Sequence, residues 1–289
     1  MAEWELRPLS LGEILDRTFS LYRRHFFLFV GIIAIPQLLI LALNLAQVLF
    51  VQTPNNPLSQ TAPHVQRAPS SGLMAFGVVG LLIGLVVYMV AYLFAQGGTI
   101  YAVSDLYLGR PTTVGASLRR MWGQLLNLLG VIILNGFVIA IGVILLIIPG
   151  IYLACRLLIC VPAALLEDLG ARESLERSFA LTKDYAGRAF VISFLYAMIL
   201  YAAIFLFALP FGILLFLFAK DPGMLRVSLA LFQMGNFLAN ILVTPFLLIA
   251  TSVFYYDLRV RKEAFDLQLM MDPSGNVPAG GAHVPSMLS

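Results

Sequence analysis

The chain has 289 residues, of which 60% are apolar and 11% are charged, whereas about 25% of residues are charged in soluble proteins. So few charged side chains cannot cover so much apolar surface in water, and the mean hydropathy of +0.92 agrees, so the composition excludes a soluble globular protein. The formal net charge of +3 is small and scattered, which argues against a nucleic-acid-binding surface.

Six apolar segments reach or approach the length needed to cross about 30 Å of hydrocarbon. They cover residues 26–51, 73–95, 125–148, 151–166, 189–219 and 229–255, and Arg156 is the one charged residue within them. A membrane barrel would need short strands of alternating polarity. These long segments therefore predict an all-α polytopic membrane protein with six transmembrane helices. The fourth segment is short, follows Pro149-Gly150, and can also be interpreted as re-entrant.

The basic residues support six spans. If all six segments cross and the N-terminus is cytoplasmic, fourteen basic residues lie inside and three lie outside. The inner ones are Arg7, Arg17, Arg23, Arg24, Arg110, Arg119, Arg120, Arg172, Arg177, Lys183, Arg188, Arg259, Arg261 and Lys262, and the outer ones are Arg67, Lys220 and Arg226. This bias follows the positive-inside rule and predicts that both termini are cytoplasmic. We expect one membrane domain over residues 1–266 and a disordered cytoplasmic tail over residues 267–289.

Three segments that precede pairs of spans resemble one another. Residues 12–19, 115–122 and 172–179 each contain a leucine, an arginine two positions later and an aromatic residue two positions further. The pattern predicts three units, each made of an amphipathic interfacial helix and a transmembrane hairpin. The alternative is that basic and aromatic segments next to a membrane look alike by composition. The matched residues Arg17, Arg120 and Arg177 are candidate ligands for anionic lipid phosphates.

The first of these segments also carries a start signal. Ser10 and Glu13 form a capping-box pattern, so a helix is expected to begin there. An interfacial helix of this register would place Ile14, Leu15, Phe19 and Tyr22 near the lipid.

Polar and small residues inside the spans suggest sites of helix contact. The first span contains Gln37, Asn44 and Gln47, and the sixth contains Gln233, Asn236 and Asn240, in each case at helical spacing. Because lipid offers amides no partner, these faces should be turned toward protein. Two interpretations remain open, interhelical hydrogen bonds or a path for a polar solute. In the second span Gly77, Gly80 and Gly84 share one face and predict close helix packing.

Arg156 is the strongest single candidate for a site, because a lone arginine in a membrane span is expensive and usually functional. No carboxylate lies in another span to pair with it. The open partners are helix-end carbonyls, amides of neighbouring spans, or an anion such as a lipid phosphate. The simpler alternative is that its side chain extends to the outer headgroups.

No catalytic or metal-binding motif is present, so no enzyme, cofactor or metal is predicted. Cys155 and Cys160 fall on different faces of a helix and are interpreted as core residues. The carboxylates Glu167, Asp168, Glu173 and Glu176 lie among arginines, and a solvated helix face is the simplest interpretation.

Three stretches resemble the bacterial family named for the membrane domain of glycerophosphoryl diester phosphodiesterases. They are residues 6–16, residues 149–154 with Arg156, and residues 255–262, and the resemblance extends from about Leu6 to Asp266. Family members that justify the name join such a membrane region to a soluble hydrolase barrel. Only about 20 residues follow the last motif here, so the resemblance implies the membrane region without catalytic residues.

The expected function is therefore that of a non-catalytic protein of the bacterial inner membrane. The first hypothesis is a lipid-associated or scaffolding module, accessory to lipid or envelope metabolism, with anionic lipids and a membrane protein as partners and no nucleic acid. The alternative is a small transporter or channel for a solute or lipid, using the polar faces of the first and sixth spans. The oligomeric state is left open.

Overall fold

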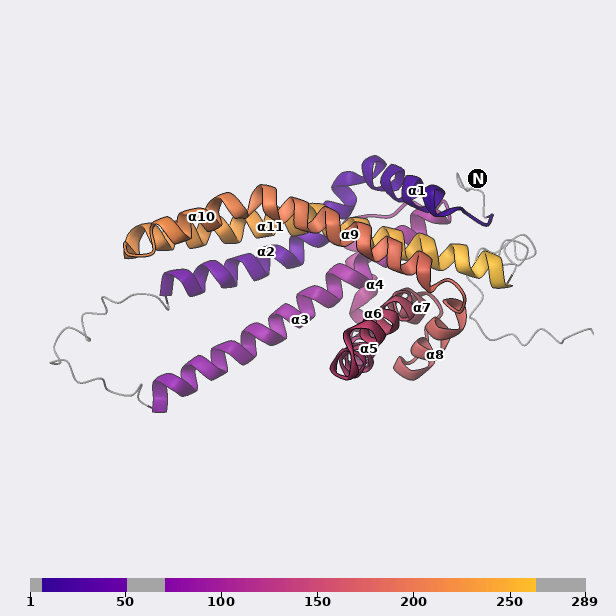
Figure 1. Cartoon of the computed structure of the whole chain (residues 1–289), viewed down its shortest axis with the longest axis horizontal. Coiled ribbons are helices and arrows are strands. Elements are labelled where there is room, and N and C mark those ends of the chain that lie inside the picture. The colour runs from indigo at the N-terminus through magenta and orange to yellow at the C-terminus, as the bar shows by residue number, and fades with distance from the viewer. Residues whose placement is uncertain (1–6, 51–70, 264–289) are drawn as a thin grey trace, which may run out of the picture. The chain divides into compact units, whose positions relative to one another are not determined.

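The computed structural model describes residues 7–50 and 71–263, with side-chain surroundings given except at residues 47–50, 71–81 and 222. The predicted tail and most of the loop between the first two spans lie outside this range. All regular elements of the described residues are helices (Figure 1). They are α1 (Leu11–Arg24), α2 (Phe26–Phe50), α3 (Ser71–Tyr107), α4 (Val114–Met121), the short 3-10 helix η1 (Trp122–Gln124), α5 (Leu125–Leu145), α6 (Ile147–Arg156), α7 (Cys160–Leu166), α8 (Ala171–Leu181), α9 (Ala186–Phe207), α10 (Leu209–Leu217) and α11 (Pro222–Glu263).

The predicted fold class is confirmed. Six helical segments of the described chain are long and apolar enough to cross a membrane. They are Phe26–Ala46, Leu82–Tyr107, Val114–Leu145, Ile147–Leu166, Ala186–Phe207 and Gly223–Glu263. The order of short and long elements also follows the predicted threefold pattern, because α1, α4 and α8 each precede a pair of apolar segments.

The fourth segment differs in detail from its prediction. The chain turns at Leu146, whose backbone is extended (φ −165°, ψ 148°), and not at Pro149-Gly150. Pro149 lies in the first turn of α6, where a missing backbone N–H disturbs no hydrogen bond. Glycine is needed at position 150, because an added Cβ would lie 2.8 Å from the Cα of Val143 in α5. The helix is interrupted again between Arg156 and Cys160, where α7 begins.

The predicted fifth segment, 189–219, is two helices. Helix α9 ends at Phe207 and α10 begins at Leu209, with Pro210 in its first turn. Proline cannot continue a helix without losing a backbone hydrogen bond, which accounts for the break. Gly235 of α11 lies against this break, since an added Cβ there would come within 2.2 Å of the Phe207 carbonyl oxygen.

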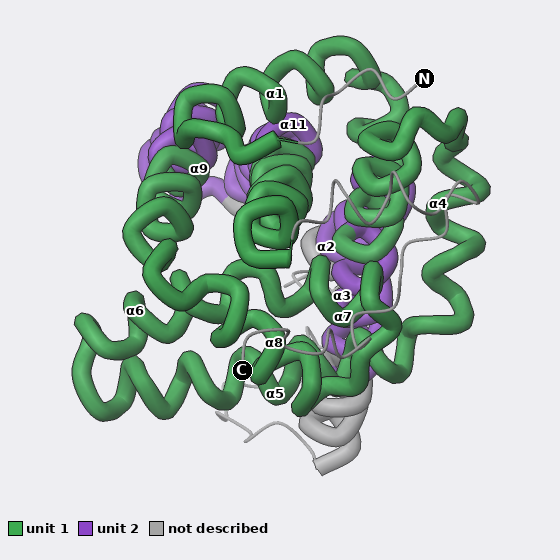
Figure 2. The backbone as a smooth tube through the Cα atoms, turned by 90° about the vertical axis from the view of Figure 1, so that its right-hand side faces the viewer, with its two compact units in different colours: residues 1–32, 96–197, 245–289 green, residues 33–95, 198–244 purple. Residues whose placement is uncertain are grey.

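The chain contains two compact units, shown in different colours in Figure 2. Unit 1 comprises Met1–Ile32, Gln96–Ala197 and Pro245–Ser289, and unit 2 comprises Ile33–Ala95 and Met198–Thr244. The boundaries fall inside α2, α3, α9 and α11, so the same long helices contribute to both. The predicted membrane domain over residues 1–266 therefore contains two units.

Helix α1 begins as predicted, with Ser10 as N-cap and a complete capping box with Glu13. Its apolar face, however, is only partly turned outward. Ile14 and Leu21 are fully buried in the core of unit 1, so the expectation that Ile14 faces lipid is wrong. Phe19 is 58% exposed and keeps the predicted orientation. The face of an amphipathic helix that looks suited to lipid can equally well cover a protein core.

Candidate functional site

Unit 2 contains a polar pocket of about 170 Å³ between amide-bearing helices. It is lined by Gln37, Ile40, Leu41 and Asn44 of α2, Tyr88 of α3, and Gln233, Asn236, Phe237 and Asn240 of α11. We call it the amide pocket. The structure thus brings together five of the six amides predicted from the first and sixth spans. Gln47, the sixth, lies among residues whose side-chain surroundings are not described.

The helical register explains why these residues converge. Gln37 and Asn44 are seven residues apart on α2, and Asn236 and Asn240 are four apart on α11, so each pair lies on one helix face. Gln37 is eleven residues beyond the start of α2 at Phe26, about 17 Å along the helix axis. Asn44, seven residues further, is about 27 Å along the axis, so in a bilayer with about 30 Å of hydrocarbon the pocket would extend from near the midplane toward the far end of the span.

Two of the pocket amides are held by their own helix. The Nδ2 of Asn236 donates to the carbonyl of Phe232 at 3.1 Å, and the Nδ2 of Asn240 donates to the carbonyl of Asn236 at 2.8 Å. A carbonyl accepts but cannot donate, so these contacts determine which end of each amide is the nitrogen. The Oδ1 of each side chain has no partner among the described residues.

The other three amides are not engaged at all. Within the described part of the chain, the side chains of Gln37, Asn44 and Gln233 form no hydrogen bond. Tyr88 stacks on Tyr92, with ring centroids 6.3 Å apart, which fixes the ring beside the pocket. Polar groups at membrane depth need partners inside the protein or in a water-filled cavity. The amide pocket therefore offers several free hydrogen-bonding groups to a ligand.

The predicted glycine contact is not seen at Gly84, where an added Cβ would meet no other part of the chain within 4 Å. Gly77 and Gly80 lie where side-chain surroundings are not described. The close helix approaches of the described residues occur instead at Gly97, Gly142, Gly150 and Gly235.

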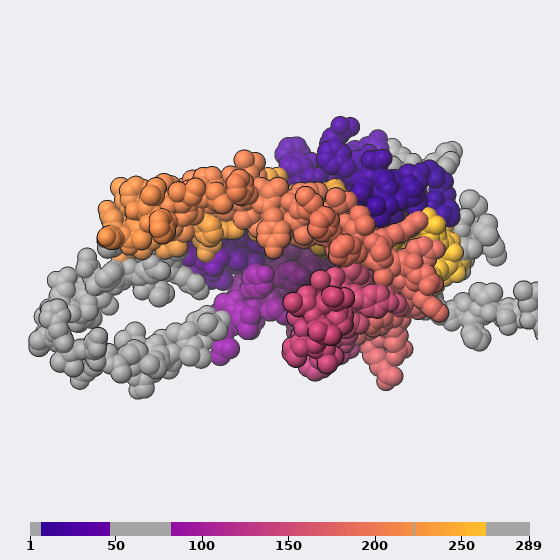
Figure 3. Space-filling model, viewed as in Figure 1, coloured from indigo at the N-terminus to yellow at the C-terminus, as the bar shows by residue number. Residues whose placement is uncertain are grey.

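A second, apolar cavity of about 630 Å³ adjoins the break between α9 and α10. It is lined by Tyr201, Ile204, Phe205, Leu209, Gly212, Ile213 and Phe216, with Phe232 of α11. Phe205 and Phe216 are 65% and 85% exposed, and α10 (orange in Figure 3) has its side chains on the molecular surface. Because this open lining is almost wholly apolar, hydrocarbon is its suitable occupant.

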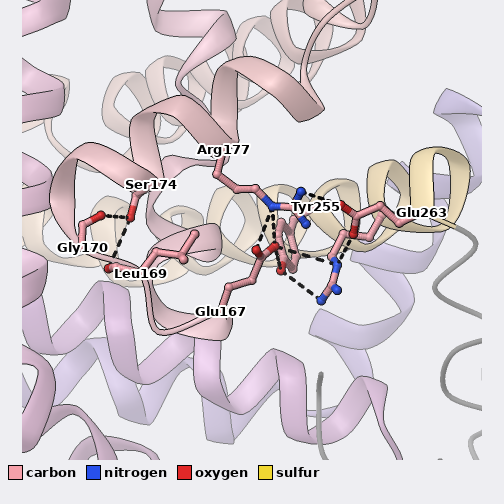
Figure 4. A network of polar contacts seen from close by, with 8 residues as sticks. Glu167, Leu169, Gly170, Ser174, Arg177, Tyr255 and Glu263 are labelled. Carbon is pink, nitrogen blue, oxygen red and sulfur yellow. Dashed lines mark hydrogen bonds and ion pairs between the residues drawn. The ribbon is translucent and has the colours of Figure 1, made fainter. Parts of the chain in front are cut away.

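Unit 1 holds a buried network of ionised side chains around Glu167, which is 3% exposed (Figure 4). Arg177 of α8 donates from Nε to both Glu167 oxygens, at 3.0 and 2.7 Å, and its Nη1 lies 2.5 Å from Glu263. Arg259 lies 3.0 Å from Glu263 and 3.9 Å from Glu167. The Tyr255 hydroxyl donates to Glu167 at 2.7 Å. We call these five residues the Glu167 network, and they join α7, α8 and α11.

The formal charges of the Glu167 network balance, because two arginines pair with two carboxylates. Burial lowers the pKa of Arg177, but its hydrogen bond to Glu263 and the charge of Glu167 together raise that pKa above the usual arginine value. The solvated helix face that the sequence suggested for Glu167 is therefore wrong. Glu176 does fit that prediction, because it is exposed and pairs only with Arg172 of the same helix among the described residues.

A second set of contacts attaches the N-terminal segment to α11. The Leu9 backbone N–H donates to Asp257 at 2.6 Å, and the Leu9 carbonyl accepts from Arg261 at 2.5 Å and from Arg188 at 3.1 Å. Arg261 also donates to both Asp257 oxygens. The hydroxyl of Tyr256, the residue before Asp257, lies 2.8 Å from the Ser104 hydroxyl. Residues 255–262 of α11 thus hold the N-terminal segment and α3 by polar contacts within unit 1.

The three matched arginines contact protein groups. Arg17 donates to the Tyr107 hydroxyl at 2.8 Å, and Arg120 lies 3.5 Å from Asp105 and over the Tyr101 ring. Arg177 belongs to the Glu167 network, with two carboxylates as partners. Lipid binding by these residues stays a prediction, but Arg177 has its charge neutralised within the protein.

Arg156 bonds to α8 and the residue that follows it. Its Nη2 donates to the Phe179 carbonyl at 2.6 Å, its Nε to Thr182 at 3.1 Å, and its Nη1 to the Tyr152 hydroxyl at 3.0 Å. Of the partners considered from the sequence, a carbonyl near a helix end is the one found. These bonds hold the guanidinium against α6 and α8 within unit 1. The alternative, in which the side chain extends to the outer headgroups, would need the guanidinium to point away from the protein.

The described residues contain no group of three His, Cys, Asp or Glu side chains arranged to hold a metal ion. The chain matches no protein-family model, and no curated protein or solved structure shows significant similarity to it. The resemblance noted for residues 6–16, residues 149–154 with Arg156, and residues 255–262 therefore stays a prediction. In the structure, these three stretches supply contacts that hold unit 1 together.

Proposed function

We propose that this chain is a multi-pass membrane protein that binds a small polar solute in the amide pocket and lets it cross the membrane. The observation that carries the proposal is the convergence of amides from α2 and α11 in one pocket, three of them without a partner in the described chain. A protein that needed these amides only for helix packing would pair them with one another.

Two further features support transport. The Gln37 end of the amide pocket is expected near the bilayer midplane, where many transporters bind their substrates. The same unit contains the interruption between α9 and α10, and discontinuous helices are common near such sites. The positive-inside bias supports six spans with both termini in the cytoplasm, and we extend the proposal to the inner membrane of a bacterium.

A flux measurement tests this proposal. Purified protein is reconstituted into liposomes, and entry of urea, ethylene glycol and erythritol is followed by stopped-flow light scattering. We expect at least one of these solutes to enter faster than into protein-free liposomes. Asn236→Leu and Asn240→Leu should each reduce that flux to the background.

Asn135→Leu is the matched control, because Asn135 is an amide in the α5 span and is absent from the pocket lining. Its flux should equal that of the unchanged protein. Flux at background for all three solutes would overturn the proposal, and so would equal losses in the control and pocket variants.

A second candidate function is the lipid-associated module first suggested by the sequence, and the apolar cavity favours it. A cavity of about 630 Å³ with aromatic walls has the size and polarity to hold a lipid chain. Phe232→Trp places a fluorophore at its wall. Quenching of that fluorophore by lipids with brominated acyl chains, beyond the quenching of Phe137→Trp, would support this function, because Phe137 is 62% exposed on α5 and absent from the cavity lining. Equal quenching of the two tryptophans would mean that the cavity holds no specific lipid, and would contradict this second function.

A further inference from the structure

The lining of the amide pocket contains no formal charge. Its nine residues carry five amides, one phenol hydroxyl and three apolar side chains. An ion brought into such a site would lose its hydration without meeting an opposite charge, which is strongly unfavourable. The lining therefore suits an uncharged ligand.

The lining also presents more fixed hydrogen-bond acceptors than fixed donors. Because their nitrogens are bound to backbone carbonyls, Asn236 and Asn240 have their Oδ1 atoms left as acceptors. The two residues are one turn apart, about 6 Å along the axis of α11. A ligand that satisfies both acceptors needs at least two donor groups. Gln37, Asn44 and Gln233 can rotate to accept or donate, so they accommodate such a ligand but do not add to the preference.

The volume limits the size of the ligand. At about 170 Å³ the amide pocket is smaller than the roughly 300 Å³ at which pockets for drug-sized molecules begin. A solute of a few heavy atoms fits, whereas a nucleotide is too large.

From these three features we infer that the amide pocket selects small uncharged solutes with two or more N–H or O–H donors. The inference rests on the proposed function and names its substrate class. Ions and donor-free molecules of the same shape are rejected, ions because they meet no counter-charge and donor-free molecules because they leave the Asn236 and Asn240 oxygens unsatisfied.

Three planar molecules of four heavy atoms test this inference directly. Urea is uncharged and has N–H donors, acetone has the same shape without donors, and guanidinium has donors and a positive charge. Each is added, at millimolar concentration, as a competitor of radiolabelled urea entering the proteoliposomes. We expect unlabelled urea to compete at concentrations about tenfold lower than acetone or guanidinium, the effect of one unsatisfied buried hydrogen-bonding group. Ethylene glycol should compete like urea.

The Asn240→Leu variant links this selectivity to the pocket. Any urea entry that the variant retains should no longer distinguish urea from acetone, while Asn135→Leu keeps the full difference. Size-exclusion profiles and thermal unfolding of both variants show whether each is folded.

Acetone or guanidinium competing as well as urea would overturn the inferred solute class. The proposed function would stand in that case, because a solute would still enter through the protein. Entry of urea at the rate of protein-free liposomes, together with background flux for ethylene glycol and erythritol, would instead overturn the proposed function itself.

Discussion

Unit 1 and unit 2 both place polar side chains among apolar helices, but the buried carboxylates of unit 1 and the pocket amides of unit 2 differ in their partners. In unit 1, Glu167 and Asp257 are at most 3% exposed, and each is bonded to arginines and to a further N–H or O–H donor. In unit 2, the amides of Gln37, Asn44 and Gln233 line a pocket without a partner in the described chain.

This contrast distinguishes polar side chains that stabilise the fold from polar side chains that are available to a ligand. A buried charge with its partners removed is costly, so the arginines and carboxylates of unit 1 hold each other in place. An amide without a partner must be satisfied from outside the chain. Unit 1 therefore has the properties of a support, and unit 2 has those of a binding site.

The largest effect is expected when the support loses its central charge. Glu167→Gln leaves Arg177 and Arg259 partly unpaired in a buried position, and we expect about 3–5 kcal/mol of destabilisation. Thermal unfolding of the purified protein in mild detergent measures this loss. Glu176→Gln removes a carboxylate from an exposed pair on α8, the helix that carries Arg177, and should change stability by less than about 1 kcal/mol. Similar stabilities for the two variants would contradict the structural role of the Glu167 network.

An intermediate effect is expected from packing in unit 1 without any change of charge. Gly150→Ala puts a methyl group 2.8 Å from the Val143 backbone and should separate α5 from α6, at about 1–3 kcal/mol. Gly136→Ala in α5 is the control, since an added Cβ there meets nothing within 4 Å. We expect Gly136→Ala to leave stability unchanged or to raise it slightly, because alanine favours a helix. An equal loss in both variants would mean that close contact at Gly150 is not what holds this hairpin.

A small effect is expected when an amide is removed from unit 2. Asn240→Leu replaces a side chain whose Oδ1 has no partner in the described chain, so the unfolding free energy should stay within about 0.5 kcal/mol of the unchanged protein or rise. Solute flux should nevertheless be lost. A destabilisation like that of Glu167→Gln would show that the pocket amides are structural, and the contrast between the units would fail.

Much of this arrangement could be predicted from the sequence, and the exceptions have physical reasons. The amides of α2 and α11 converge as expected, because their helical spacing places them on single faces. Tyr88 was missed, since one tyrosine in an apolar span has no such pattern. The break at Ala208 was also missed, although Pro210 lies within the predicted fifth segment and proline interrupts helices.

Charged residues were the harder part of the prediction. The sequence around an arginine next to a membrane does not show whether its partner is a lipid phosphate or a carboxylate distant in the chain. The contacts of Arg177 could therefore not be anticipated. Glu167 was assigned to a solvated face because it lies among other charges. The available clue was the spacing of Tyr255, Arg259 and Glu263, which are four residues apart and share one face of α11.

The smallest expected effect concerns an exposed polar pair of unit 1, the capping box of α1. The Glu13 carboxylate accepts hydrogen bonds from the Ser10 backbone N–H and from Arg7, and these contacts lower its pKa from 4.5 to about 2. Because the pKa is lower in the folded protein, the ionised carboxylate stabilises the helix start above pH 4.5. This contribution should disappear as the pH falls from 4.5 through about 2. Hydrogen exchange at the first-turn amides of α1 measures it, and Glu13→Gln should remove its pH dependence while leaving the Glu167 network intact. If the α1 amides of Glu13→Gln exchange faster at low pH to the same extent as those of the unchanged protein, the acid sensitivity belongs to a buried group. The exposed contacts of Glu13 would then not be its cause.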